Sequence, residues 1–163
     1  MQGTDWRRML RAGSSGHNSP LHVHPRVLAM TFQPPASTPI RLQQRQLLDG
    51  RRQLRDELAL IEARAAQHAD LNALAWVDWK RAARLAEEAQ AAVRSLGAGA
   101  FAARPLQGVF ISVKDLFNLD GAPTHAGTRA VLPDLGRQAA VVDRLEEAGA
   151  IVFAKTNMHE IAL

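Results

Sequence analysis

Two short apolar segments with a helical pattern between them constrain the fold of this chain most strongly. The first segment, residues 109–113, is apolar and largely β-branched and is bounded by Gly108 and Lys114. The second, residues 151–154, is an unbroken run of Ile, Val, Phe and Ala. Short continuous apolar runs are typical of strands that are buried on both faces. The sequence therefore predicts an α/β fold in which two parallel strands are joined by a right-handed crossover.

The connection between these strands is expected to be a long loop followed by a helix. Residues 115–136 are rich in turn formers, namely Gly121, Pro123, Gly127, Pro133 and Gly136. Residues 137–148 then place Val141, Val142, Leu145 and Ala148 at helical spacing. Gly149 follows and is expected to end this helix, because glycine commonly terminates helices.

Two earlier segments predict an antiparallel pair of helices. From about Leu42 to His68 the apolar positions recur on one face, at Leu47, Leu54, Leu58 and Ile61. Residues 70–75 read as a break between the helices. Asp78 can then cap a second helix through its side-chain oxygen, and Gly97 is expected to end it. The short connection makes the two helices antiparallel neighbours.

Residues 1–40 are expected to form a separate leader. Residues 1–39 hold five of the eight prolines and show no helical period, so a disordered leader is predicted. Two further interpretations stay open: an arginine-bearing transit peptide, or an over-extended start with Met30 as the true first residue. The folded domain is assigned to residues 41–163.

Composition narrows the classes of partner. The formal net charge of +4 arises in residues 1–60, which contain nine arginines and four acidic residues. The rest of the chain has no excess of basic residues, so the sequence indicates no basic surface on a folded element. No nucleic-acid partner is therefore expected. The chain has no cysteine, which excludes disulfides and thiolate zinc sites and fits a reducing compartment. No apolar run approaches the roughly 20 residues of a membrane span, so no membrane partner is expected either.

Lys114 is the first candidate for chemistry, because it directly follows the first predicted strand and reactive groups of α/β sheets gather at strand ends. A lysine acts as a base only when it is neutral, and its reference pKa of about 10.4 must then be lowered by burial or nearby cations. Taken alone, the residue is better explained as a solvated lysine at the end of a strand.

Five blocks of sequence change this interpretation. They are 105–109 with 111–115, 121–124 with 126–128, 141–145, 148–150 and 155–160. In this order they resemble the N-terminal third of the amidase signature family, which includes aliphatic amidases and the A subunit of tRNA-dependent amidotransferases. The resemblance covers about residues 42–163. It implies a fragment of the amidase-signature fold, in which a helical pair precedes a β-α-β unit of a larger mixed sheet.

The resemblance also implies a mechanism. Members hydrolyse carboxylic amide C–N bonds with a Ser–Ser–Lys triad, in which the lysine takes a proton from a bridging serine and that serine activates the nucleophile. Lys114 matches the lysine. The resemblance implies a small-molecule amide substrate, no cofactor and no metal, a cytoplasmic location, and either a homodimer or an amidotransferase-type complex.

Both serines of the triad are expected beyond this sequence. In the family they follow the block matched by residues 155–160, whereas no serine follows Ser112 here. We therefore expect a truncated amidase domain that is inactive alone. Ser14 and Ser15 lie in the leader, and Ser112 shares the face of Lys114 but has no nucleophilic partner. Lys155, Asp115 and Asp120 are assigned no catalytic role: the lysine is interpreted as structural, and the aspartates as solvated or capping.

Three functions remain open from the sequence. The first is an enzyme lineage, either amide hydrolysis or glutamine-dependent amidotransfer. The second is a non-catalytic assembly module that docks through the helical pair. The third is a gene remnant or a gene-model error at one or both ends, in which a cut sheet leaves strand edges unpaired.

Overall fold

The computed structural model of the protein describes residues 40–133 and 136–163. The leader predicted over residues 1–40 therefore lies outside the described residues, apart from Ile40, which begins the first helix. The helices are α1 (Ile40–Leu48), α2 (Leu54–Gln67), α3 (Trp79–Leu96), α4 (Gly99–Ala103) and α5 (Ala140–Glu147), with short 3-10 turns η3 (Ala69–Leu71) and η4 (Glu160–Ala162). The strands are β1 (Leu74–Val77), β2 (Phe110–Lys114) and β3 (Ile151–Thr156).

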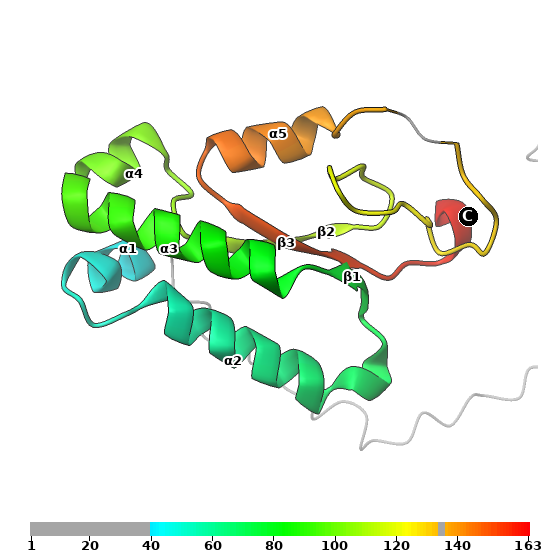
Figure 1. Cartoon of the computed structure of the whole chain (residues 1–163), viewed down its shortest axis with the longest axis horizontal. Helices are drawn as coiled ribbons and strands as arrows, with labels where there is room; N and C mark the ends of the chain where they lie inside the picture. The colour runs from blue at the N-terminus through cyan, green and yellow to red at the C-terminus, as the bar shows by residue number, and fades with distance from the viewer. Residues whose placement is uncertain (1–39, 134–135) are drawn as a thin grey trace, which may run out of the picture. The chain divides into compact units, whose positions relative to one another are not determined.

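The sheet is mixed and has the strand order β1-β3-β2 (Figure 1). β2 and β3 are parallel, as the two apolar runs predicted, and Lys114 lies beside Thr156 in their register. β1 pairs antiparallel with β3 and was not predicted, because residues 70–75 had been interpreted as a break between helices. All four residues of β1 are half-buried, so the strand shows no alternation that a pattern search could detect.

Helices cover both faces of the sheet. Alternation along β3 sends Ile151 and Phe153 to the face that packs on the upstream helices, and Val152 to the face that packs on α5. Phe153 is stacked on Trp79 at a centroid distance of 5.6 Å. The larger core contains side chains from α1, α2, α3, α4 and β3, among them Leu47, Leu54, Leu58, Ala86, Val93 and Ala100. The chain is therefore layered as helices, sheet and helix.

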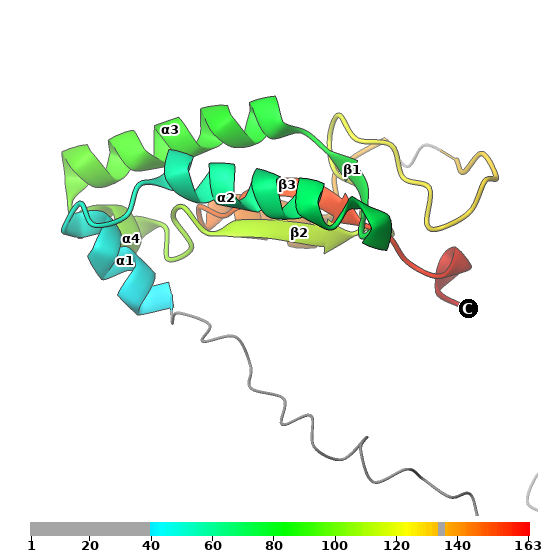
Figure 2. The ribbon, with the colours of Figure 1, turned by 90° about the horizontal axis from the view of Figure 1, so that it is seen from below.

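The predicted helical pair is present as α2 and α3, which lie side by side and antiparallel (Figures 1 and 2). The prediction of one continuous helix over residues 42–68 is wrong, because the chain turns at Gly50 and begins a new helix at Leu54. Gly50 has φ +70°, a left-handed conformation that glycine adopts without strain. The backbone N–H of Leu54 donates to the buried Gln90 Oε1 at 3.0 Å, which satisfies a free donor at the start of α2.

The ends of α3 agree with the sequence. Asp78 Oδ1 accepts a hydrogen bond from the Arg81 N–H at 2.9 Å, as a capping side chain should. Gly97 follows the last helical residue and has a positive φ. Within residues 40–133 and 136–163, no helix is both long and apolar enough to cross a membrane.

Candidate active site

Lys114 is the last residue of β2 and lies at its carboxyl end, where the sequence placed it. Its side chain is half-buried, and among the described residues its ammonium has neither a hydrogen bond nor an ion pair. Ser112 lies two residues earlier on the same face of the strand and is exposed. Among the described residues the sheet therefore presents an unpaired lysine with two hydroxyl-bearing residues beside it, Ser112 on β2 and Thr156 on β3.

β2 is an outer strand of the described sheet, so one of its edges faces away from β3. The Asp115 N–H donates to the Thr156 carbonyl at 3.0 Å, and the Val109 carbonyl accepts from the Ile151 N–H at 2.8 Å. Backbone groups alternate in direction along a strand, so the odd-numbered residues bond to β3 and those of Phe110 and Ser112 point outward. An edge of this kind can accept a further strand.

The residue that follows Lys114 takes part in a fully buried ion pair. The side chains of Lys155 and Asp115 are 0% and 1% exposed, and Lys155 Nζ lies 2.8 Å from Asp115 Oδ1. The contact is an ion pair by distance but does not meet hydrogen-bond geometry at Oδ1. Nζ also donates to the Pro123 carbonyl at 2.8 Å and to the Thr124 hydroxyl at 2.7 Å. Three oxygens thus surround the ammonium, which matches its three donor hydrogens.

Asp115 also holds the loop that follows β2. Its Oδ2 accepts from the His125 N–H at 3.1 Å, and its carbonyl accepts from the Ala126 N–H at 3.3 Å. The Thr124 hydroxyl in turn donates to Asn118 Oδ1 at 3.0 Å. Residues 115–126 are therefore folded back over the buried pair and held by both side-chain and backbone contacts.

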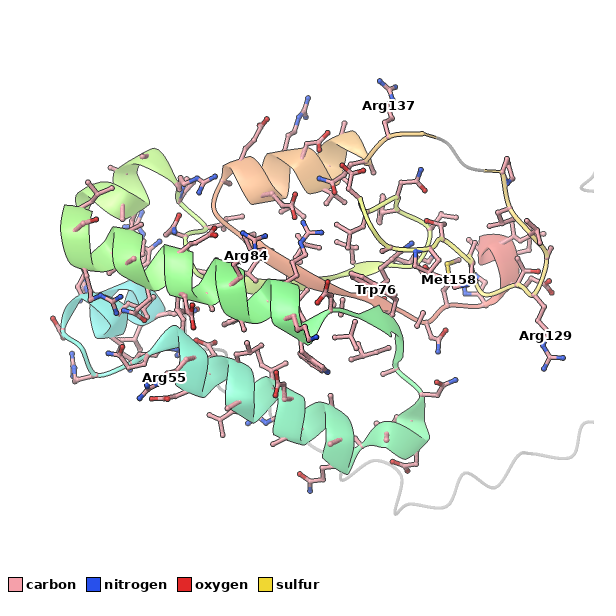
Figure 3. The ribbon with its side chains drawn as sticks, in the orientation of Figure 1. Arg55, Trp76, Arg84, Arg129, Arg137 and Met158 are labelled. Carbon is pink, nitrogen blue, oxygen red and sulfur yellow. The ribbon has the colours of Figure 1, made fainter. Side chains whose placement is uncertain are left out.

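The same loop is pressed against the segment after β3. Gly127 has φ +71°, and a Cβ at this position would lie 2.5 Å from the Met158 carbonyl oxygen. An open depression of about 510 Å³ lies alongside, lined by polar residues that include Asn72, Asp115, His125 and Asn157. Arg129 points away from the fold at the margin of this loop (Figure 3).

The structure corrects one assignment made from the sequence and deepens another. Asp115 was expected to be solvated or to cap a turn, but it is buried and paired with Lys155. Lys155 was interpreted as structural, and the structure adds that its side chain is fully buried and paired with a carboxylate. A signal was available: Lys155 directly continues the apolar run 151–154, and a lysine that extends a buried strand needs a partner. Asp120 is exposed, as expected.

The remaining sequence candidates, Ser14 and Ser15, lie outside the described residues. Within residues 40–133 and 136–163, no group of three His, Cys, Asp or Glu side chains could hold a metal ion.

Comparison with known proteins identifies the family. The family model described as Amidase matches residues 58–163, which is more than half of the chain. This chain belongs to the amidase family. It is 43% identical over 119 residues to the A subunit of the glutamyl-tRNA(Gln) amidotransferase of Nitratidesulfovibrio vulgaris (strain DP4), a match that covers 68% of this chain and 24% of that protein. It is also 45% identical over 58 residues to an amidase of Pseudomonas putida, covering 36% of this chain and 12% of that protein.

Solved structures of amidases share the fold. A crystal structure of an amidase superposes with a TM-score of 0.67 at 43% identity, over 76% of this chain and 28% of that one. The native peptide amidase of Stenotrophomonas maltophilia superposes with a TM-score of 0.65 at 27% identity, over 77% of this chain and 26% of that one. The predicted fold class, a part of the amidase-signature fold, is confirmed. The chain spans about a quarter of the length of these matched proteins.

Proposed function

We propose that this chain is the lysine-bearing N-terminal part of an amidase that hydrolyses carboxylic amide C–N bonds through a Ser–Ser–Lys triad. Lys114 is the proposed base. It accepts the proton of a bridging serine, which then deprotonates the serine that attacks the amide carbonyl. The attack gives a tetrahedral intermediate, which collapses to an acyl-enzyme as the protonated amine leaves. Water then releases the acid and regenerates the serine.

The contrast between two lysines carries this proposal. Lys155 donates two hydrogen bonds and forms an ion pair with Asp115, so its ammonium is fully engaged in buried contacts. Lys114 ends the neighbouring strand with no partner among the described residues, and an ammonium must be free of such contacts to give up and retake a proton. Since the proposed serines are absent after Ser112, the 163-residue polypeptide is proposed to be inactive alone.

An assay of the isolated polypeptide tests the proposal. Simple aliphatic and aromatic amides are incubated with the folded 163-residue chain, and the release of ammonia is measured against a matched Lys114→Ala variant. No turnover above the variant is expected. Turnover that disappears in Lys114→Ala would show that these residues already form a complete site. Turnover that survives in Lys114→Ala would show that another group is the base.

Glutamine-dependent amidotransfer is a second candidate, favoured by the 43% identity to the A subunit of a glutamyl-tRNA(Gln) amidotransferase. In this case the ammonia released from glutamine is passed to an acceptor, and the chain acts within a complex. Two observations separate the candidates. Size-exclusion chromatography and pull-down experiments should show a stable protein partner for a component of such a complex and none for a free-standing amidase. Glutamine should also be the preferred substrate only for the amidotransferase component.

A further inference from the structure

The proposed chemistry uses Lys114 and leaves the buried Lys155–Asp115 pair without a role. We propose that Lys155 is a positioning residue, which fixes the end of β2 so that Lys114 projects in one direction. The inference rests on the proposed function of Lys114. It starts from the position of Asp115, which directly follows Lys114 in the chain and is the partner of Lys155.

The contacts of Lys155 tie two separate parts of the chain together. Its backbone belongs to β3, whereas its ammonium contacts Asp115, Pro123 and Thr124 in the loop that follows β2. Beyond the paired strand residues, the Asp115 N–H donates to the Thr156 carbonyl at 3.0 Å and the Thr156 hydroxyl donates to the Val113 carbonyl at 3.4 Å. The side chain of Lys155 adds the contact with the Asp115 carboxylate, and it joins the end of β2 to the loop at Pro123 and Thr124.

The two faces of β2 explain how this contact acts on Lys114. Val113 lies beside Lys155 in the register of β2 and β3, so these side chains share the face that packs on α5. Alternation places Asp115 on that same face and Lys114 on the opposite one. Because the two residues are consecutive, a twist of the end of β2 that takes Asp115 out of its pocket would also redirect Lys114.

A buried ion pair is a poor choice if filling the core is the only requirement. Two apolar side chains of similar volume would stabilise the fold as well or better, because they avoid the desolvation of two charges. The contacts of Lys155 have fixed directions, so they instead favour one conformation of residues 115–126. Thr124 links Asn118 to the same conformation, because its hydroxyl accepts a hydrogen bond from Lys155 and donates one to Asn118.

The small number of lysines makes a direct test feasible. The chain has three, Lys80, Lys114 and Lys155, so a protein labelled with ¹³C at lysine Cε gives three side-chain signals. Each is assigned by a lysine-to-arginine variant. Lys80 is exposed on α3 and serves as the internal control. The test variant is Thr124→Val, which keeps the shape of the side chain but removes one of the three oxygens around Lys155. Thr124→Ser keeps the hydroxyl and is the matched rescue.

The expected result is a coupled change. In Thr124→Val the Lys155 signal shifts, the Lys114 signal moves toward the free-lysine position of Lys80, and Thr124→Ser restores both. A shift of Lys155 with an unchanged Lys114 signal would leave Lys155 with a purely structural role and overturn the inference, as would the absence of any shift. If Thr124→Val unfolds the chain, Asn118→Ala is measured instead, because it removes the acceptor of the Thr124 hydroxyl and leaves all three oxygens around Lys155; its only other loss among the described side-chain contacts is the exposed hydrogen bond to the Arg137 carbonyl.

This readout needs no turnover, so its failure is distinct from that of the proposed function. Uncoupled lysine signals would reject the positioning role and leave Lys114 as the base. Amide hydrolysis that survives Lys114→Ala would reject the base, even if the signals of the two lysines remained coupled.

Discussion

Replacing Lys155 by Met should be among the most destabilising single changes in this domain. The two side chains have similar length, so little volume is lost, but Asp115 is left as a buried carboxylate with one remaining backbone donor on its side chain, the His125 N–H. Breaking a buried pair by removing one partner costs about 3–5 kcal/mol. Domains of this size have a total stability of about 5–15 kcal/mol, so the variant should be marginally folded.

Urea denaturation of the 163-residue chain measures this loss. Trp76 on β1 lies opposite Lys155 in the sheet register, so tryptophan fluorescence reports on the region. With a urea m-value of about 2 kcal/mol per M, a loss of about 4 kcal/mol lowers the midpoint by about 2 M. The double variant Lys155→Met with Asp115→Leu removes both charges and should recover most of the loss.

An exposed ion pair provides the control for this experiment. Arg84 and Glu88 pair across one turn of α3 with side chains that are 61% and 59% exposed. Arg84→Met should therefore cost only about 0.3–0.5 kcal/mol. If Lys155→Met costs less than about 1 kcal/mol, or if the double variant is as unstable as the sum of the two single variants, the reasoning about the buried pair is refuted.

Three further changes test separate parts of the structure by the same denaturation assay. Gly127→Ala should destabilise by about 1–3 kcal/mol, because its φ is +71° and the new Cβ would meet the Met158 carbonyl; an unchanged midpoint would mean that this contact is not formed. Asp78→Ala should cost about 1 kcal/mol through loss of the cap on α3, and Asp78→Asn should restore most of it. Lys114→Met should change stability by no more than about 0.5 kcal/mol, because the ammonium has no partner among the described residues; a large loss would reveal a structural role.

The sequence predicts those parts of the fold that depend on neighbouring residues, namely runs of apolar residues and residues that cap helices. The apolar runs at residues 109–113 and 151–154 predicted β2 and β3. β3 is buried at its first five positions, as a strand covered on both faces should be, whereas β2 is only partly buried and includes the exposed Ser112. Asp78 and Gly97 predicted the ends of α3 through local backbone chemistry. β1 was missed because its four half-buried residues take their conformation from pairing with β3, a contact more than 70 residues distant in the chain.

The surroundings of the candidate site were predicted unevenly for a similar reason. The position of Lys114 could be predicted because it ends a recognisable strand, whereas its role as the base stays a prediction. The pairing of Lys155 with Asp115 could not, because it depends on a loop that folds back so that Pro123 and Thr124 reach the ammonium. The conformation of such a loop is not encoded by any repeating pattern of apolar residues, so the sequence does not reveal it. The apolar run before Lys155 shows only that its charge must find a partner.

The most direct test of the central claim is a chimeric protein. Residues 40–163 of this chain replace the matching segment of the crystallised amidase, to which this chain is 43% identical, and are followed by the rest of that amidase. Amide hydrolysis by the chimeric protein is measured with Lys114, with Lys114→Met and with the exposed control Lys80→Met. Loss of a general base lowers the rate by about 10²–10⁴-fold, so Lys114→Met should fall by this factor while Lys80→Met keeps the activity. A folded, active chimeric protein in which Lys114→Met hydrolyses amides as fast as its parent would contradict the assignment of Lys114 as the base.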